Sequence, residues 1–120
     1  MKQYQFIDGL SPAIDTMVTK NVIDFLDEDC ILQPGNATPV RGHAAITEVF
    51  DNLYAQIQSI KHNIIDDFAV NNSAVYRGTV TYKRLDGSLL TVPFCDVFKI
   101  KNNLISEYNI YIDWHQLFVS

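Results

Sequence analysis

The chain has 120 residues, of which 48% are hydrophobic and 19% charged, and its formal net charge is −5. This composition is typical of one globular domain with its own core, so we expect a single domain over residues 1–120. The acidic balance argues against a nucleic-acid or anionic-membrane partner, since either would favour a basic face. No apolar run approaches the roughly 20 residues of a membrane span, and the first residues do not resemble a signal peptide. We therefore expect a cytoplasmic protein.

Helical signals occupy the first part of the chain. Residues 4–9 predict a short helix, and Ser11 with Pro12 is typical of the start of a second helix that continues to about Asp27. Residues 30–33 predict a short strand, which a Pro- and Gly-rich segment follows. Gly42 then precedes a third helix, whose apolar positions recur at helical spacing and indicate a face packed on the core: Ile46, Val49, Phe50, Leu53, Tyr54 and Ile57.

Strand-like runs fill the remainder of the chain, at residues 60–68, 73–84, 89–100 and 104–114. Asn71-Asn72, Asp86-Gly87 and Asn102-Asn103 separate them, and Asp86-Gly87 is a strong signal for a two-residue hairpin loop. Helices followed by an antiparallel meander predict an α+β fold in which the helices pack on one face of a curved sheet.

The hairpin also predicts a cross-strand register. If Leu85 faces Ser88, then Arg77 faces Asp96, and the two side chains would form an ion pair. A guanidinium that points into an apolar cavity needs such a partner, because an unpaired buried charge is costly. The alternative is that Arg77 binds the carboxylate or carbonyl group of a ligand.

Other chemistry has little support in the sequence. Cys30 and Cys95 lie far apart in apolar runs, without a C-x-x-C spacing, and we interpret them as buried thiols. The three histidines show no metal-ligand spacing. The sequence has no nucleophile elbow and no phosphate-binding glycine loop, so we expect neither a metal nor a cofactor.

Three segments carry a resemblance to a known family: "PVRGHAAITEVF", "RLDGSLLTVPFCDVFKI" and "LISEYNIYIDW". They resemble the SnoaL-like branch of the nuclear-transport-factor-2-like superfamily, over roughly residues 4–118. The resemblance implies a cystatin-like conical barrel, in which a strongly curved antiparallel sheet wraps around N-terminal helices and leaves a mostly apolar pocket. It also implies a homodimer formed through the convex sheet face. Members include ketosteroid isomerases, limonene epoxide hydrolases, polyketide cyclases and binding proteins, so the fold leaves the chemistry open.

The isomerase and epoxide hydrolase residues are largely missing. Gln33 occupies the place of the isomerases' proton-abstracting aspartate, and an amide cannot act as that base. Pro93 occupies the place of their oxyanion-binding aspartate, and their tyrosine falls near Gln3. Of the hydrolases' Asp-Arg-Asp set only the arginine is matched, by Arg77, because the aspartates fall at Thr79 and Ile110. Resemblance to the SnoaL cyclases, which use a late acid/base aspartate, leaves Asp113 and Asp96 as catalytic candidates.

These observations lead to three hypotheses. The first is a protein that binds a small apolar or amphipathic molecule, with this set of ligand-binding residues: Gln33, Tyr54, Arg77, Phe94, Tyr108, Ile110 and Trp114. The second is an acid/base enzyme of cyclase, isomerase or dehydratase type that acts on a carbonyl compound through Asp96 or Asp113. The third is an interaction module with an aromatic outer sheet face made of Tyr76, Tyr82, Phe98 and Tyr111. His115 and Asp113 are expected near the pocket mouth.

Overall fold

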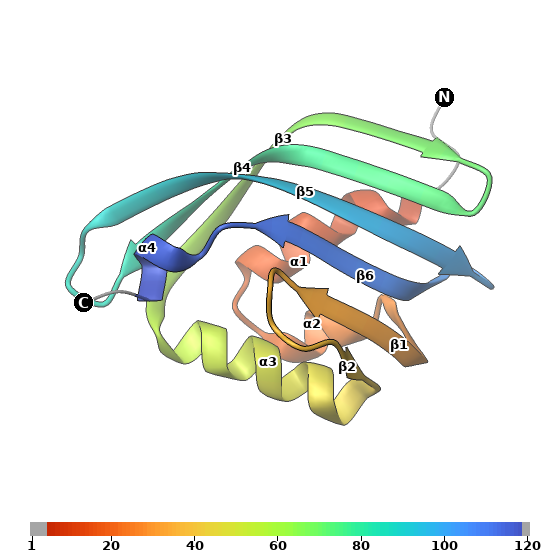
Figure 1. Cartoon of the computed structure of the whole chain (residues 1–120), viewed down its shortest axis with the longest axis horizontal. Coiled ribbons are helices and arrows are strands. Elements are labelled where there is room, and N and C mark those ends of the chain that lie inside the picture. The colour runs from red at the N-terminus through yellow and green to blue at the C-terminus, as the bar shows by residue number, and fades with distance from the viewer. Residues whose placement is uncertain (1–4, 119–120) are drawn as a thin grey trace.

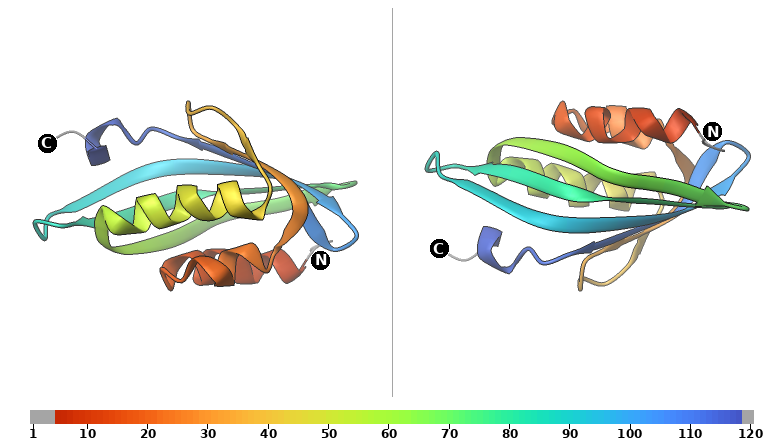
Figure 2. Two further views of the ribbon diagram at one scale, coloured as in Figure 1. Left: turned by 90° about the horizontal axis from the view of Figure 1, so that it is seen from below. Right: turned by 90° about the horizontal axis from the view of Figure 1, so that it is seen from above.

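The computed structural model describes residues 5–118, which form a curved sheet with helices on one side (Figure 1). Seen from below, α3 lies in front of the strands, and seen from above the strands lie in front of α3 (Figure 2). The elements in chain order are η1 (Gln5–Gly9), α1 (Leu10–Asp15), α2 (Thr19–Ile23), β1 (Leu26–Pro34), β2 (Val40–Arg41), α3 (His43–Ala55), β3 (Ile57–Val70), β4 (Ser73–Arg84), β5 (Leu89–Lys101), β6 (Leu104–Ile112) and α4 (His115–Phe118). The predicted α+β class and helix-covered curved sheet are confirmed.

The six strands form one open sheet in the order β2-β1-β6-β5-β4-β3. The last four strands form the predicted antiparallel meander. The sheet is not wholly antiparallel, however, because β1 pairs in parallel with β6, and Pro34 lies opposite Ile110. This pairing places the Pro- and Gly-rich segment after β1 beside the end of the last strand.

The predicted long second helix is interrupted. Met17 adopts a left-handed conformation, with φ of 59°, and separates α1 from α2. Helix α1 begins at Leu10 with Gly9 as its N-cap, so the predicted N-cap at Ser11 is wrong. The break lets two short helices bury different side chains, since Leu10 and Ile14 come from α1 and Val22 comes from α2.

The Asp86-Gly87 hairpin has a three-residue loop, not the predicted two-residue loop. Arg84 and Ser88 are the last paired residues: the Arg84 amide donates to the Ser88 carbonyl at 2.8 Å, and Gly87, with φ of 89°, donates to the Arg84 carbonyl at 2.9 Å. A glycine in the left-handed region is typical of such loops. The register therefore differs by one residue from the prediction.

This one-residue difference separates Arg77 from Asp96. Arg77 lies opposite Cys95, and Asp96 lies opposite Tyr76. Because successive side chains of a strand point to opposite faces, Arg77 points outward and Asp96 inward. The predicted Arg77–Asp96 ion pair is wrong. Arg77 instead donates to Asp66 Oδ2 from Nε at 2.9 Å and from Nη2 at 2.6 Å.

The predicted aromatic outer face is also wrong for most of its members. Tyr76, Tyr82 and Phe98 are buried on the inner face, where Tyr76 donates a hydrogen bond to Asp8. Only Tyr111 of the four is exposed, at 60%. Among residues 5–118, no helix is long and apolar enough to cross a membrane.

Candidate functional site

A small cavity of about 30 Å³ lies between the inner face of the sheet and the helices. Five of the predicted site residues line it: Phe94, Asp96, Tyr108, Ile110 and Trp114. The others that line it are Ile14 of α1, Phe50 and Leu53 of α3, and Ile60, His62, Val80, Tyr82 and Ile112 of the sheet. The walls are thus apolar or aromatic, apart from one carboxyl group and one imidazole.

A larger groove of about 300 Å³ adjoins this cavity. Four residues line both spaces: Phe50, Leu53, Ile110 and Trp114. The groove's remaining walls come from the end of β1 and the segment after it, from α3 and its C-cap, and from α4: Pro34, Ala37, Thr38, Val49, Asn52, Gln56 and Phe118. Groove and cavity together form a funnel, which is wide and apolar outside and narrow inside. We call this combined space the funnel.

Asp96 of β5 is the unusual group in the funnel. The residue is 4% exposed, and its Oδ1 atom has no hydrogen-bond partner among the described residues. Burial raises the pKa of this carboxyl group well above its ordinary value of 3.8. Because burial penalises the ionised form and no cation offsets that penalty, the structure favours the protonated acid.

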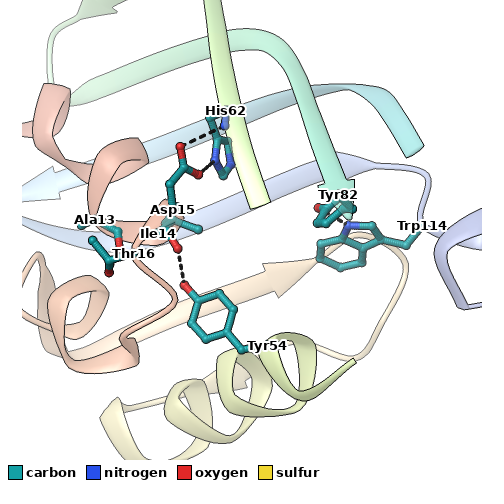
Figure 3. Close-up of polar contacts among 8 residues, drawn as sticks. All are labelled: Ala13, Ile14, Asp15, Thr16, Tyr54, His62, Tyr82 and Trp114. Carbon is teal, nitrogen blue, oxygen red and sulfur yellow. Dashed lines mark hydrogen bonds and ion pairs between the residues drawn. The ribbon is translucent and has the colours of Figure 1, made fainter. Parts of the chain in front are cut away.

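Trp114 is held in place by a hydrogen bond from its indole Nε1 to the Tyr82 hydroxyl at 2.7 Å (Figure 3). Burial raises the pKa of the Tyr82 hydroxyl, so it stays protonated and neutral. The bond joins β4 to the segment after β6. It thereby fixes an aromatic wall that the cavity and the groove share.

His62 of β3 and Asp15 at the end of α1 form a second polar feature, which the sequence interpretation missed. The His62 Nδ1 atom lies 2.6 Å from Asp15 Oδ1, and the His62 backbone amide donates to Asp15 Oδ2 at 3.0 Å (Figure 3). The side chains are 8% and 15% exposed. The alternation of Ile60 and His62 along the strand predicts that this histidine points inward, but no local pattern identifies Asp15 as its partner.

Tyr54 and Gln33, both predicted to bind a ligand, make hydrogen bonds within the protein. The Tyr54 hydroxyl donates to the Ile14 carbonyl at 2.8 Å and ties α3 to α1 (Figure 3). The Gln33 amide donates to the carbonyls of Gly35 at 2.9 Å and Ala37 at 2.5 Å. Gln33 lines neither the cavity nor the groove, and its contacts hold the segment that forms one wall of the groove.

Asp113, the other catalytic candidate, lies at the rim. Its Oδ1 accepts a hydrogen bond from the His115 backbone amide at 2.9 Å, and the residue is exposed. Asp113 and His115 line an open depression of about 410 Å³ together with Trp114 and Phe118, which also line the groove. Arg77 lies outside the funnel, on the outer face, and is 53% exposed.

The two cysteines are not joined by a disulfide bond. Within the described part of the chain, no cluster of three or more His, Cys, Asp or Glu side chains could hold a metal ion. Burial raises the pKa of Cys30 to about 12, so its thiol stays protonated and inert. Cys95 is only partly buried, on the outer face opposite Arg77, and is less enclosed than predicted.

Comparison with known proteins agrees with this architecture. The model of the SnoaL-like domain family matches residues 7–108, and the chain belongs to this family. No curated protein matches the sequence.

Several solved structures share the fold at low sequence identity. An NTF2-like protein of unknown function from Burkholderia pseudomallei is 14% identical, with a TM-score of 0.85 over 94% of this chain and 92% of that chain. An LEH-like epoxide hydrolase from M. tuberculosis is 14% identical, with a TM-score of 0.79 over 96% and 85%. TerC, co-crystallised with polyporic acid, is 15% identical, with a TM-score of 0.83 over 94% and 95%. The chain therefore has the nuclear-transport-factor-2-like fold.

Proposed function

We propose that the protein binds a small, uncharged, mostly apolar molecule that carries a carbonyl oxygen. The apolar body of the ligand lies in the groove, and its oxygen enters the inner cavity and accepts a hydrogen bond from Asp96. The single observation that carries this proposal is the buried Asp96 carboxyl group, whose Oδ1 has no partner within residues 5–118.

The Asp96 Oδ1 atom is a buried polar atom without a hydrogen-bond partner among the described residues. Leaving a buried donor or acceptor without a partner costs about 1–3 kcal/mol, so a native fold keeps such an atom only where something offsets the cost. A protonated carboxyl group can donate to a carbonyl oxygen, whereas a carboxylate would only accept. An apolar site with one convergent polar group is the usual form of a small-molecule pocket.

The funnel also limits the ligand. The inner cavity, of about 30 Å³, has room for little more than one small group, whereas the groove, of about 300 Å³, has room for an apolar body. A charged ligand is disfavoured, because no Lys or Arg side chain within residues 5–118 lines either space. The co-crystal of TerC with polyporic acid supports the proposal, since that protein of the same fold was obtained with a small organic molecule.

A matched pair of bicyclic compounds tests the proposal. Indanone has a ketone oxygen that indane lacks, while the two hydrocarbon bodies are alike. Two-dimensional NMR titration of the whole protein measures both affinities, and the indole Nε1 resonance of Trp114 reports on the wall common to cavity and groove. We expect both compounds to shift this resonance and the ketone to bind more tightly. The proposed function is contradicted if the Trp114 resonance does not shift with either compound at high concentration.

A further inference from the structure

His62 presents a complete hydrogen-bonding arrangement on one side of its ring. The Asp15 carboxylate makes two contacts with His62: one with the His62 backbone amide at 3.0 Å and one with the ring Nδ1 at 2.6 Å. A carboxylate accepts, so Nδ1 carries the proton, and the nitrogen left to act as a base is Nε2. No described residue makes a hydrogen bond to Nε2, although the ring is largely buried.

The position of the His62 ring suits it for a role beyond the structural link between β3 and α1. His62 lines the same small cavity as Asp96, and its ring meets Phe94 edge-on, with centroids 5.3 Å apart. The cavity therefore holds one oriented imidazole and one carboxyl group, and its other walls are apolar side chains and tyrosines. An oriented base and a hydrogen-bond donor in one mostly apolar cavity are the two groups that removal of a proton beside a carbonyl requires.

We propose that His62 is a general base that removes a proton from the carbon next to the carbonyl group of the bound molecule, and that Asp15 is the positioning residue that orients it. This inference rests on the proposed function, because it uses the same site and the same hydrogen bond from Asp96.

The step is balanced without a co-reactant. Nε2 of His62 takes the proton, the C–H bonding pair becomes the new carbon–carbon double bond, and the carbonyl π pair moves onto the oxygen that Asp96 contacts. Asp15 stabilises the imidazolium that forms. The imidazolium then returns its proton to the same carbon, or to another carbon of a conjugated substrate, which completes an isomerisation. No atom is oxidised or reduced overall.

Proton exchange in deuterium oxide tests the inference. Proton NMR follows replacement of the indanone hydrogens next to the carbonyl, with wild-type protein and with buffer alone. We expect the protein to accelerate the exchange. His62→Asn keeps a donor for Asp15 but removes the base, and we expect the protein-dependent rate to fall about 100-fold or more. His43→Gln is the matched control, because His43 bonds the Leu26 carbonyl away from the funnel and its replacement retains a donor.

Asp15→Asn tests the positioning role. We expect kcat to fall while KM stays within about twofold, because the substrate contacts are retained and the base is misoriented. We also expect the downfield Nδ1 proton resonance of His62 to disappear. If His62→Asn does not fold, His62→Gln takes its place.

The outcomes separate the two proposals. Exchange at the buffer rate with wild-type protein overturns the catalytic inference, whether or not indanone binds. Exchange that survives in both folded His62 variants, or that is lost equally in His43→Gln, also overturns it. If indanone shifts the Trp114 resonance but its hydrogens next to the carbonyl exchange only at the buffer rate, the binding function is supported and the catalytic inference is overturned.

Discussion

Replacing Asp96 with asparagine should change how stability depends on pH. In the folded protein burial raises the pKa of Asp96 well above 3.8, whereas the unfolded chain exposes the group to water. As pH rises above about 3.8, the unfolded state therefore releases a proton that the folded state retains. The unfolded state then binds fewer protons, so the free energy of unfolding falls with rising pH until the folded group also ionises.

The size of this change in the free energy of unfolding follows from the ionisation of one carboxyl group. A difference of one bound proton lowers the free energy of unfolding by about 1.4 kcal/mol for each pH unit. The wild type should therefore lose up to about 2.8 kcal/mol relative to Asp96→Asn between about pH 5 and about pH 7. Urea unfolding of both proteins at these pH values measures the difference.

A matched variant isolates this effect. Asp113→Asn removes an exposed carboxyl group at the rim, and we expect it to keep the wild-type slope. The reasoning is refuted if the wild-type and Asp96→Asn curves run parallel, since Asp96 would then release its proton equally in both states.

Three further predictions concern the sheet. Gly78→Ala should lower the free energy of unfolding by about 1–3 kcal/mol, because its Cβ would lie 2.0 Å from the Asn63 carbonyl oxygen; unchanged urea unfolding would refute the close approach. Arg77→Ala should cost under about 1 kcal/mol, since its ion pair with Asp66 is half-exposed; a larger loss in the same assay would show that Arg77 has a structural role. We expect a homodimer through the outer sheet face, which Tyr111→Glu disrupts in size-exclusion mass measurement, and a monomeric wild type would contradict this expectation.

Alternation and helical spacing predicted most of the architecture. The meander, the long helix and the shared face of Tyr108 and Ile110 follow from local periodicity, because one face of each element is buried. These signals depend on neighbouring residues along the chain and need no knowledge of the rest of the fold.

The hairpin register could not be predicted in this way. Asp-Gly suits a two-residue loop, and it also suits the three-residue loop that the structure contains, with Gly87 in the left-handed region. Since side chains alternate, the one-residue difference moved Asp96 from an expected ion pair into the unpaired buried position that defines the site.

The His62–Asp15 pair was missed for a different reason. Its members are 47 residues apart and belong to a strand and a short helix. The pair exists because the chain breaks at Met17 and α1 packs against β3, which is a property of the tertiary structure. A histidine alone predicts no partner, so local sequence patterns could not assign a role to His62.

The proposed recognition of a carbonyl oxygen by the Asp96 carboxyl group is tested most directly by comparing indanone and indane affinities in wild type and Asp96→Leu. Leucine has nearly the shape of aspartate but no donor. A neutral hydrogen bond contributes about 0.5–1.5 kcal/mol, so the wild type should prefer the ketone by roughly 2- to 10-fold. We predict that Asp96→Leu loses this preference and binds the ketone no more tightly than indane. A ketone preference that is unchanged in Asp96→Leu would contradict the account.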